Sequence, residues 1–191
     1  MSHSRTFLNE VALVASNLDA EVIDRLADEL TTLKGRLFIL GIGGSAANAS
    51  HAANDFRKLC GIEAYAPTDN IAELTAWTND EGWDAFFMKW LVESRLSKDD
   101  AILILSVGGG DKQREISVGL IHATTLARVL GAAVYSIVGH KEGYAVQESN
   151  ICVLLPEVKK AWLTPLAESF QSVILHSLTS HPSLQKHKTK W

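Results

Sequence analysis

The chain has little of several features that define particular protein classes. Among its 191 residues are only two cysteines, Cys60 and Cys152, too few for a disulfide scaffold and without the spacing of a metal-binding pair. Lys and Arg number 18 against 22 Asp and Glu, so the chain has no basic excess with which to bind a nucleic-acid backbone. We therefore expect both cysteines to be reduced core residues and expect no nucleic-acid partner.

Long apolar runs are also missing. No run approaches the roughly 18 residues that a membrane helix requires, and the first ten residues, MSHSRTFLNE, lack a basic segment followed by an apolar one. These absences predict a cytoplasmic protein with no membrane partner.

What the chain does contain is ample apolar material. Hydrophobic residues make up 47% of it, enough for one core and too little for two comfortable domains. We expect a single domain over residues 1–191. Apolar residues between positions 5 and 33 recur at helical spacing, so residues 1–34 are predicted to form a helical hairpin that packs on the main domain or on a neighbouring subunit.

Four short apolar runs fit strands buried on both faces of a parallel sheet. They are LFIL (37–40), AILIL (101–105), AAVYSIV (132–138) and ICVLL (151–155). The segments between and after them favour helices over 46–59, 112–130 and 162–179, with two more helices after residue 70. This alternation predicts an α/β fold, a doubly wound and mainly five-stranded parallel sheet flanked by helices, with extra helices at both ends.

Glycines gather directly after two of the predicted strands, in GIGGS (41–45) and SVGGG (106–110). A strand, a glycine turn and a helix start together place unpaired N–H groups and the positive end of a helix dipole at one point, which favours an anion. Tight turns with glycine at positive φ are the alternative for either loop alone. Neither loop matches a nucleotide fingerprint, so we expect a small phosphorylated or anionic ligand between them, with Ser45 and Ser106 as hydroxyl donors.

Two pairs of side chains are candidates for acid–base chemistry. His51 and Asp55 lie four residues apart, on one face of the helix predicted over 46–59 and about one turn beyond the first glycine loop. Glu168 and His176 share a face of the last helix. The polar pair Asn79 and Asp80 fits either a helix cap or a site for ligand hydroxyls. His122 and His140 have no carboxylate at useful spacing and are not candidates.

Three segments carry a resemblance to a known family: GIGGSAANASHAANDFRK, TDNIAELTAWTNDEGW and ESFQSVILH. Together they resemble the sugar isomerase (SIS) family as it occurs in bacterial phosphoheptose isomerases, and the similarity extends over nearly the whole chain. The resemblance implies an SIS-type, flavodoxin-like fold and the isomerisation of sedoheptulose 7-phosphate to an aldose through a cis-enediol. It also implies a homotetramer with sites at subunit borders.

The resemblance also implies roles for individual residues. It makes Asp55 and His176 the catalytic base and acid, in an order that could be exchanged. It implies that zinc, bound in some members, would be held here by His51, Asp55, Glu168 and His176, although no cofactor is required by the sequence. The residues that it implies for substrate binding are Ile42, Gly43, Gly44, Ser45, Asn79, Asp80, Ser106, Val107, Gly108, Asp111 and Glu168.

Three departures from the family pattern keep alternatives open. Ile42 stands where the family usually has Asn, and Asp55 where the best-known members have Glu. The second loop reads SVGGGD instead of a serine-rich sequence, which places Asp111 near the expected phosphate unless it caps the helix and Lys112 or Arg114 supplies positive charge. The alternatives are an isomerase for a different phosphosugar, and a non-catalytic sensor or adaptor with the same fold.

Overall fold

The computed structural model describes residues 2–190, so Met1 and Trp191, the ends of the expected domain, lie outside the described residues. Its centre is a parallel sheet in the order β2-β1-β3-β4-β5. The strands are β1 (Leu37–Gly41), β2 (Ala64–Tyr65), β3 (Ala101–Ser106), β4 (Ala133–Val138) and β5 (Ile151–Leu154). The predicted α/β sheet is confirmed, and the four apolar runs are four of its strands. The fifth strand, β2, has two residues and lies at the sheet edge, where no apolar run in the sequence marks it.

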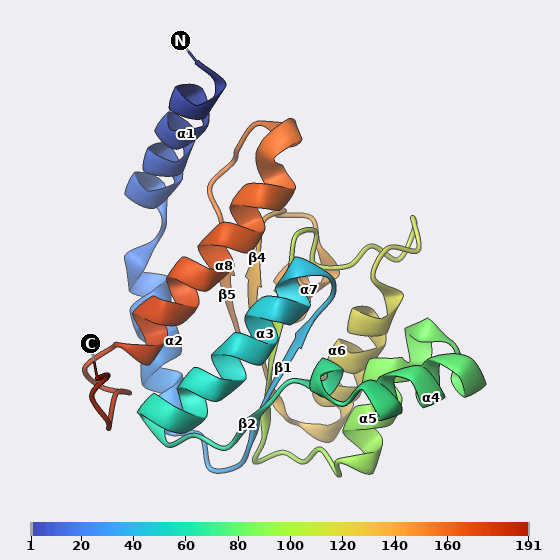
Figure 1. Ribbon diagram of the computed structural model, residues 1–191. Helices are drawn as coiled ribbons and strands as arrows, with labels where there is room; N and C mark the ends of the chain where they lie inside the picture. Colours follow the sequence, from blue (N-terminus) through green and yellow to red (C-terminus); the bar gives the residue numbers. More distant parts are fainter. Residues whose placement is uncertain (1, 191) are drawn as a thin grey trace.

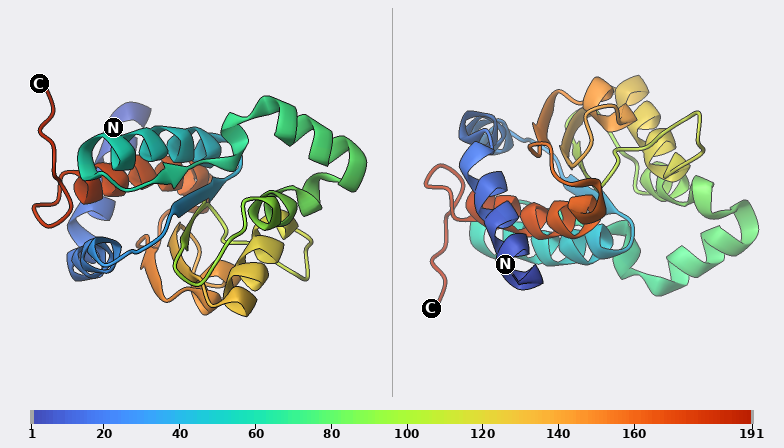
Figure 2. Two further views of the ribbon diagram at one scale, coloured as in Figure 1. Left: turned by 90° about the horizontal axis from the view of Figure 1, so that it is seen from below. Right: turned by 90° about the horizontal axis from the view of Figure 1, so that it is seen from above.

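Helices cover both faces of this sheet (Figures 1 and 2). On one face lie α2 (Ala20–Thr31), α3 (Gly44–Asp55) and α8 (Leu163–Thr179). On the other face lie α5 (Phe86–Glu93), α6 (Val118–Leu130) and α7 (Tyr144–Glu148). Successive residues of a strand point to opposite faces of the sheet, so each strand contributes side chains to the core on both sides. Leu37 and Ile39 join the core under α3, whereas Phe38 and Leu40 join the core under α5.

Short helical turns connect several of these elements. A π-helical turn, η1 (Phe56–Cys60), continues α3, and η2 (Pro67–Asp69), η3 (Trp83–Ala85) and η4 (Lys160–Trp162) are 3₁₀ turns before α4, α5 and α8. The apolar side of α5 packs into the core, since Phe86, Phe87 and Leu91 are fully buried.

Two helices extend away from the sheet. Helix α1 (His3–Asn17) precedes α2, and in Figure 1 both run down the page, so the chain bends between them instead of folding back as a hairpin. Helix α4 (Ile71–Glu81) projects on the opposite side of the molecule and contains no buried residue. Among residues 2–190, no helix combines the length and the apolarity needed to cross a membrane.

One predicted helix begins later than expected. The range 112–130 was predicted to be helical, but α6 starts at Val118. Asp111 and Ile116 exchange backbone hydrogen bonds of 2.9 and 3.0 Å, which closes a turn before the helix. Glu115 and Ser117 have positive φ values of 51° and 54°, and such left-handed residues cannot continue a right-handed helix. Local hydrogen bonding thus replaces the first turns of the predicted helix.

Candidate functional site

Both glycine loops lie at the carboxyl edge of the sheet. Strands β1 and β3 are parallel neighbours, with Gly41 opposite Leu105, so the loops that follow them lie side by side. Gly43 precedes α3 at a φ of +65°, a conformation that favours glycine. Ser45 and Ser106, the two hydroxyl residues expected to bind an anion, are both buried at this edge. This is where ligands bind in open α/β sheets.

A cavity of about 660 Å³ opens beside these loops, a size that suits a small ligand. Six of the residues expected to bind substrate line it: Ile42, Ser45, Ser106, Val107, Gly108 and Asp111. The other five, which the cavity lining does not include, are Gly43, Gly44, Asn79, Asp80 and Glu168. The second glycine loop therefore contributes more to the cavity than the first.

Several cavity residues lie outside the substrate-binding set expected from the sequence, although Arg114 is already expected there as a possible source of positive charge. Arg114 and Ser117 come from the turn before α6, His140 and Glu142 follow β4, and Lys160 lies in η4. His140 has no carboxylate near it in the sequence, so residue spacing does not mark it as a site residue. Its position directly after β4 was the signal that could have found it, because the carboxyl ends of all parallel strands meet at one edge.

Asp111 is held within its own turn. Its carboxylate accepts hydrogen bonds from the backbone N–H groups of Gln113 and Arg114, both at 2.9 Å, and from Nε of Arg114 at 2.6 Å. The hydrogen bonds from Arg114, backbone first, hold the pKa of Asp111 below its ordinary value. Asp111 thus remains ionised, but its charge is balanced by the guanidinium of Arg114.

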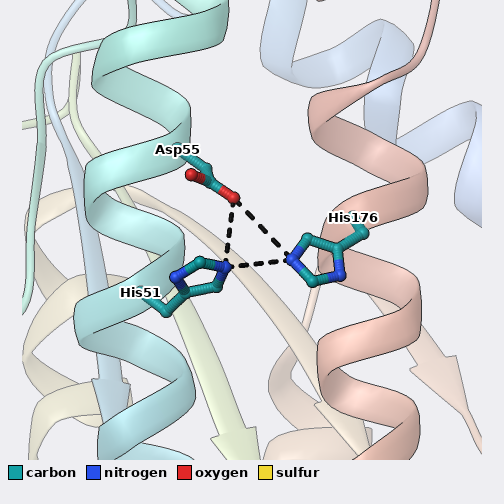
Figure 3. Close-up of side chains that lie close together, drawn as sticks. All are labelled: His51, Asp55 and His176. Carbon is teal, nitrogen blue, oxygen red and sulfur yellow. Dashed lines mark hydrogen bonds and ion pairs between the residues drawn. The ribbon is translucent and has the colours of Figure 1, made fainter. Parts of the chain in front are cut away.

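A second cluster lies on the facing sides of α3 and α8, which pack against each other (Figure 3). His51 and Asp55 project from α3 and His176 from α8. Nε2 of His51 lies 3.0 Å from Nε2 of His176 and 3.3 Å from Oδ2 of Asp55, and the distance from Asp55 Oδ2 to His176 Nε2 is 3.8 Å. Both imidazoles are about half exposed, whereas the Asp55 side chain is 15% exposed. All three are candidates from the sequence, and the structure brings them together.

This triad is farther from the glycine loop than the sequence analysis expected. With a helix rise of 1.5 Å per residue, His51 lies about 9 Å and Asp55 about 15 Å along α3 from Ser45. The expected single turn is therefore closer to two and three turns. None of the three residues lines the cavity. The chain thus presents two candidate site regions, a cavity at the sheet edge and a polar cluster on the outer surface.

Glu168 does not join the triad. It lies on α8, and a methyl group placed on Gly44 would be 2.6 Å from its carboxylate carbon. The carboxylate therefore lies against the start of α3, where the helix dipole favours negative charge. Asn48 secures the same region by donating to the backbone oxygen of Glu168 at 2.8 Å. Of the four residues implied as zinc ligands, three converge and Glu168 faces the first glycine loop.

Asn79 and Asp80 lie near the end of α4, away from the other candidates. Both are exposed, and Nδ2 of Asn79 donates to Oδ1 of Asp80 at 2.8 Å. Asn70, and not this pair, caps the start of α4 by accepting hydrogen bonds from Ala72 and Glu73. Asn79 and Asp80 therefore do not cap the start of α4, which was one of the two roles that fitted their sequence.

Comparisons with known proteins found similar sequences and similar structures. No family model matches the chain. It is 26% identical over 185 residues to the phosphoheptose isomerase of Syntrophotalea carbinolica, an alignment that covers 90% of this chain and 88% of the relative. It is 31% identical over 150 residues to the lincomycin biosynthesis protein LmbN of Streptomyces lincolnensis, covering 75% of this chain and about half, 54%, of that relative's length.

Solved structures have the same architecture. The phosphoheptose isomerase GmhA from Neisseria gonorrhoeae superposes with a TM-score of 0.77 at 21% identity, and the match covers 93% of each chain. At this identity the similarity shows the fold, which agrees with the predicted SIS-type sheet.

Proposed function

Since this chain is a phosphoheptose isomerase-like protein with the sugar isomerase (SIS) fold, we propose that it interconverts the ketose and aldose forms of a sugar phosphate. Sedoheptulose 7-phosphate is the proposed substrate. The observation that carries the proposal is the convergence of Asp55 and His176, whose facing atoms lie 3.8 Å apart on two packed helices. A carboxylate and an imidazole at this separation are suited to act on neighbouring atoms of one substrate.

The proposed reaction needs two proton movements. In one, Asp55 takes the proton from the carbon next to the carbonyl and returns it to the neighbouring carbon. In the other, His176 moves a proton between the two oxygens as the cis-enediol forms and collapses. His51 contacts both side chains and keeps them in position relative to each other.

The same triad is suited to hold a zinc ion. Two imidazoles and one carboxylate form a common donor set of catalytic zinc sites, which leave a fourth position open. Donors at about 2.0–2.1 Å around a tetrahedral zinc lie about 3.3 Å from one another. The three facing atoms of the triad, 3.0 to 3.8 Å apart, are close to that arrangement. When bound, zinc would polarise the carbonyl and hydroxyl oxygens of the sugar, and the facing atoms of Asp55 and His176 would then be its ligands instead of a free base and acid.

We further propose that the site is completed in a homotetramer. The cavity, the triad and the Asn79–Asp80 pair lie in separate places on one chain, although the resemblance assigns all of them to one substrate. Helix α4, which holds that pair, has no buried residue and exposes 68% of Ile71. Packing of α4 against a second copy would bury its apolar side chains and bring its polar end toward another chain's site.

The alternative is a sensor or adaptor that binds a sugar phosphate without converting it, since the fold by itself does not determine function. The paired Asp55 and His176 favour the enzyme, because binding alone does not need an acid–base pair. Incubation of the purified protein with sedoheptulose 7-phosphate separates the two: an enzyme forms the aldose, and a sensor only binds. A cytoplasmic location accords with a substrate of this kind.

A further inference from the structure

The second glycine loop holds few of the hydroxyl groups that usually bind a phosphate group. Ser106 is the one hydroxyl residue of the loop 106–111, and its Oγ already accepts the backbone N–H of Gly109 at 3.0 Å. Three carboxylates line the cavity, those of Asp111, Glu142 and Glu157. A phosphate dianion therefore needs a cation at short range if it is to bind here.

Of the described residues that line the cavity, Arg114 and Lys160 carry a permanent positive charge. Arg114 is the better placed of the two for a phosphate. It lies in the turn that follows the second glycine loop, and Asp111 fixes its guanidinium through Nε at 2.6 Å. A guanidinium has five N–H donors, so a contact through Nε leaves the two amino groups able to bind two phosphate oxygens together.

Lys112 lies close in sequence but has a different role. Its Nζ lies 4.1 Å from the centre of the Tyr144 ring, and the residue is outside the cavity lining. The neighbouring cation is thus directed toward an aromatic ring on α7, while Arg114 faces the cavity.

We infer that Arg114, oriented by Asp111, binds the phosphate group of the substrate in this cavity. The inference rests on the proposed function for the identity of the ligand, a phosphorylated sugar. It also changes the part that Asp111 plays. Instead of repelling the phosphate, Asp111 closes the turn through two backbone N–H groups and aims the guanidinium that binds it.

The test compares three variants with the wild type in two assays. Arg114→Gln removes the charge, Arg114→Lys keeps the charge without the planar fork, and Lys112→Gln is the matched control. The first assay measures KM and kcat with sedoheptulose 7-phosphate. The second follows binding of inorganic phosphate by phosphorus NMR titration and does not depend on turnover.

Arg114→Gln should raise KM at least about tenfold with kcat within about twofold, and should weaken phosphate binding by a similar factor. Arg114→Lys should fall between Arg114→Gln and the wild type, and Lys112→Gln should match the wild type. Because the Arg114 side chain is 67% exposed, these variants should keep the wild-type melting temperature.

Two results would overturn the inference. One is unchanged phosphate binding in Arg114→Gln, and the other is an equal loss in Lys112→Gln, which would point to general surface charge. If the wild type binds phosphate through Arg114 but converts no sugar phosphate, the proposed function fails while the inference stands.

Discussion

Nε2 of His51 and Nε2 of His176 lie 3.0 Å apart, although 125 residues separate them in the chain. Each nitrogen carries either a lone pair or a proton, so the two approach this closely only when one proton or one cation lies between them. Asp55, 3.3 Å from His51, adds a negative charge to the same point. The three groups together therefore form a site for a shared proton or a metal ion.

Zinc binding is the first expected consequence. The wild type should retain roughly one zinc ion per chain after dialysis, measured by inductively coupled plasma mass spectrometry. Loss of an outer partner of a zinc ligand costs about 10–100-fold in affinity, so His51→Gln, which removes a ligand, should cost more than that. His122→Gln changes a histidine on α6 and should leave the affinity unchanged.

The same measurement distinguishes the three-residue site from the four-residue set that the resemblance implies. Because the carboxylate of Glu168 lies against Gly44 and outside the triad, Glu168→Gln should retain zinc within about twofold of wild type. A loss as large as that of His51→Gln would show that Glu168 turns away from the glycine loop to bind the metal.

A buried ion pair should make stability depend on pH. Asp100 is 3% exposed and lies 2.9 Å from Nη2 of Arg36. Burial raises its pKa, but hydrogen bonds from Arg36 and Ser97 outweigh burial and hold the pKa below its ordinary value. The pair thus stabilises the fold fully above the unfolded pKa of about 3.9, and the stabilisation is lost as pH falls through the lower, folded value.

Asp100→Asn should therefore lower the free energy of unfolding by about 3 kcal/mol at pH 7, because it leaves the Arg36 charge without its partner. Urea unfolding at pH 7 and below pH 4 measures this, and the difference from wild type should shrink in acid. Asp99 is exposed and adjacent, so Asp99→Asn is the control and should change the free energy of unfolding by less than about 0.5 kcal/mol. An effect of Asp100→Asn that stays constant down to low pH would contradict the assignment.

Assembly through α4 is the next expectation. Ile71→Lys replaces the exposed large apolar side chain of that helix with a charged one, and it should reduce the proposed tetramer to smaller species in size-exclusion chromatography with light scattering. Val129 is 78% exposed on α6, and Val129→Lys should leave the assembly intact. A wild-type protein that runs as a monomer at micromolar concentration would contradict the proposed assembly.

The sheet was predictable because its central strands consist of apolar residues throughout. Leu37 to Leu40 and Ala101 to Leu105 are apolar at every position, which only a strand covered on both faces needs, and the glycines that follow mark their ends. The strand β2 is only two residues long and gives no periodic signal. The start of α6 was misplaced because Asp111 satisfies backbone N–H groups that a helix would otherwise have used.

The site was predictable in part, and the limit has a physical cause. His51 and Asp55 share a helix face by their spacing, but nothing local pairs them with His176, which the packing of α8 on α3 brings to them. Arg114 follows the second glycine loop and could be named with it, but His140 reaches the cavity from a loop that lacks a motif. Only the parallel arrangement of β3 and β4 places those loops at one edge.

The most direct measurement is the conversion of sedoheptulose 7-phosphate by wild type, Asp55→Asn and His176→Gln. We expect aldose formation by the wild type and a loss of at least about 100-fold in kcat for each variant, the usual contribution of a general acid or base. His181→Gln, near the end of α8, should retain wild-type activity. No turnover by the folded wild type, or full activity in both triad variants, would contradict the assignment of an isomerase to this triad.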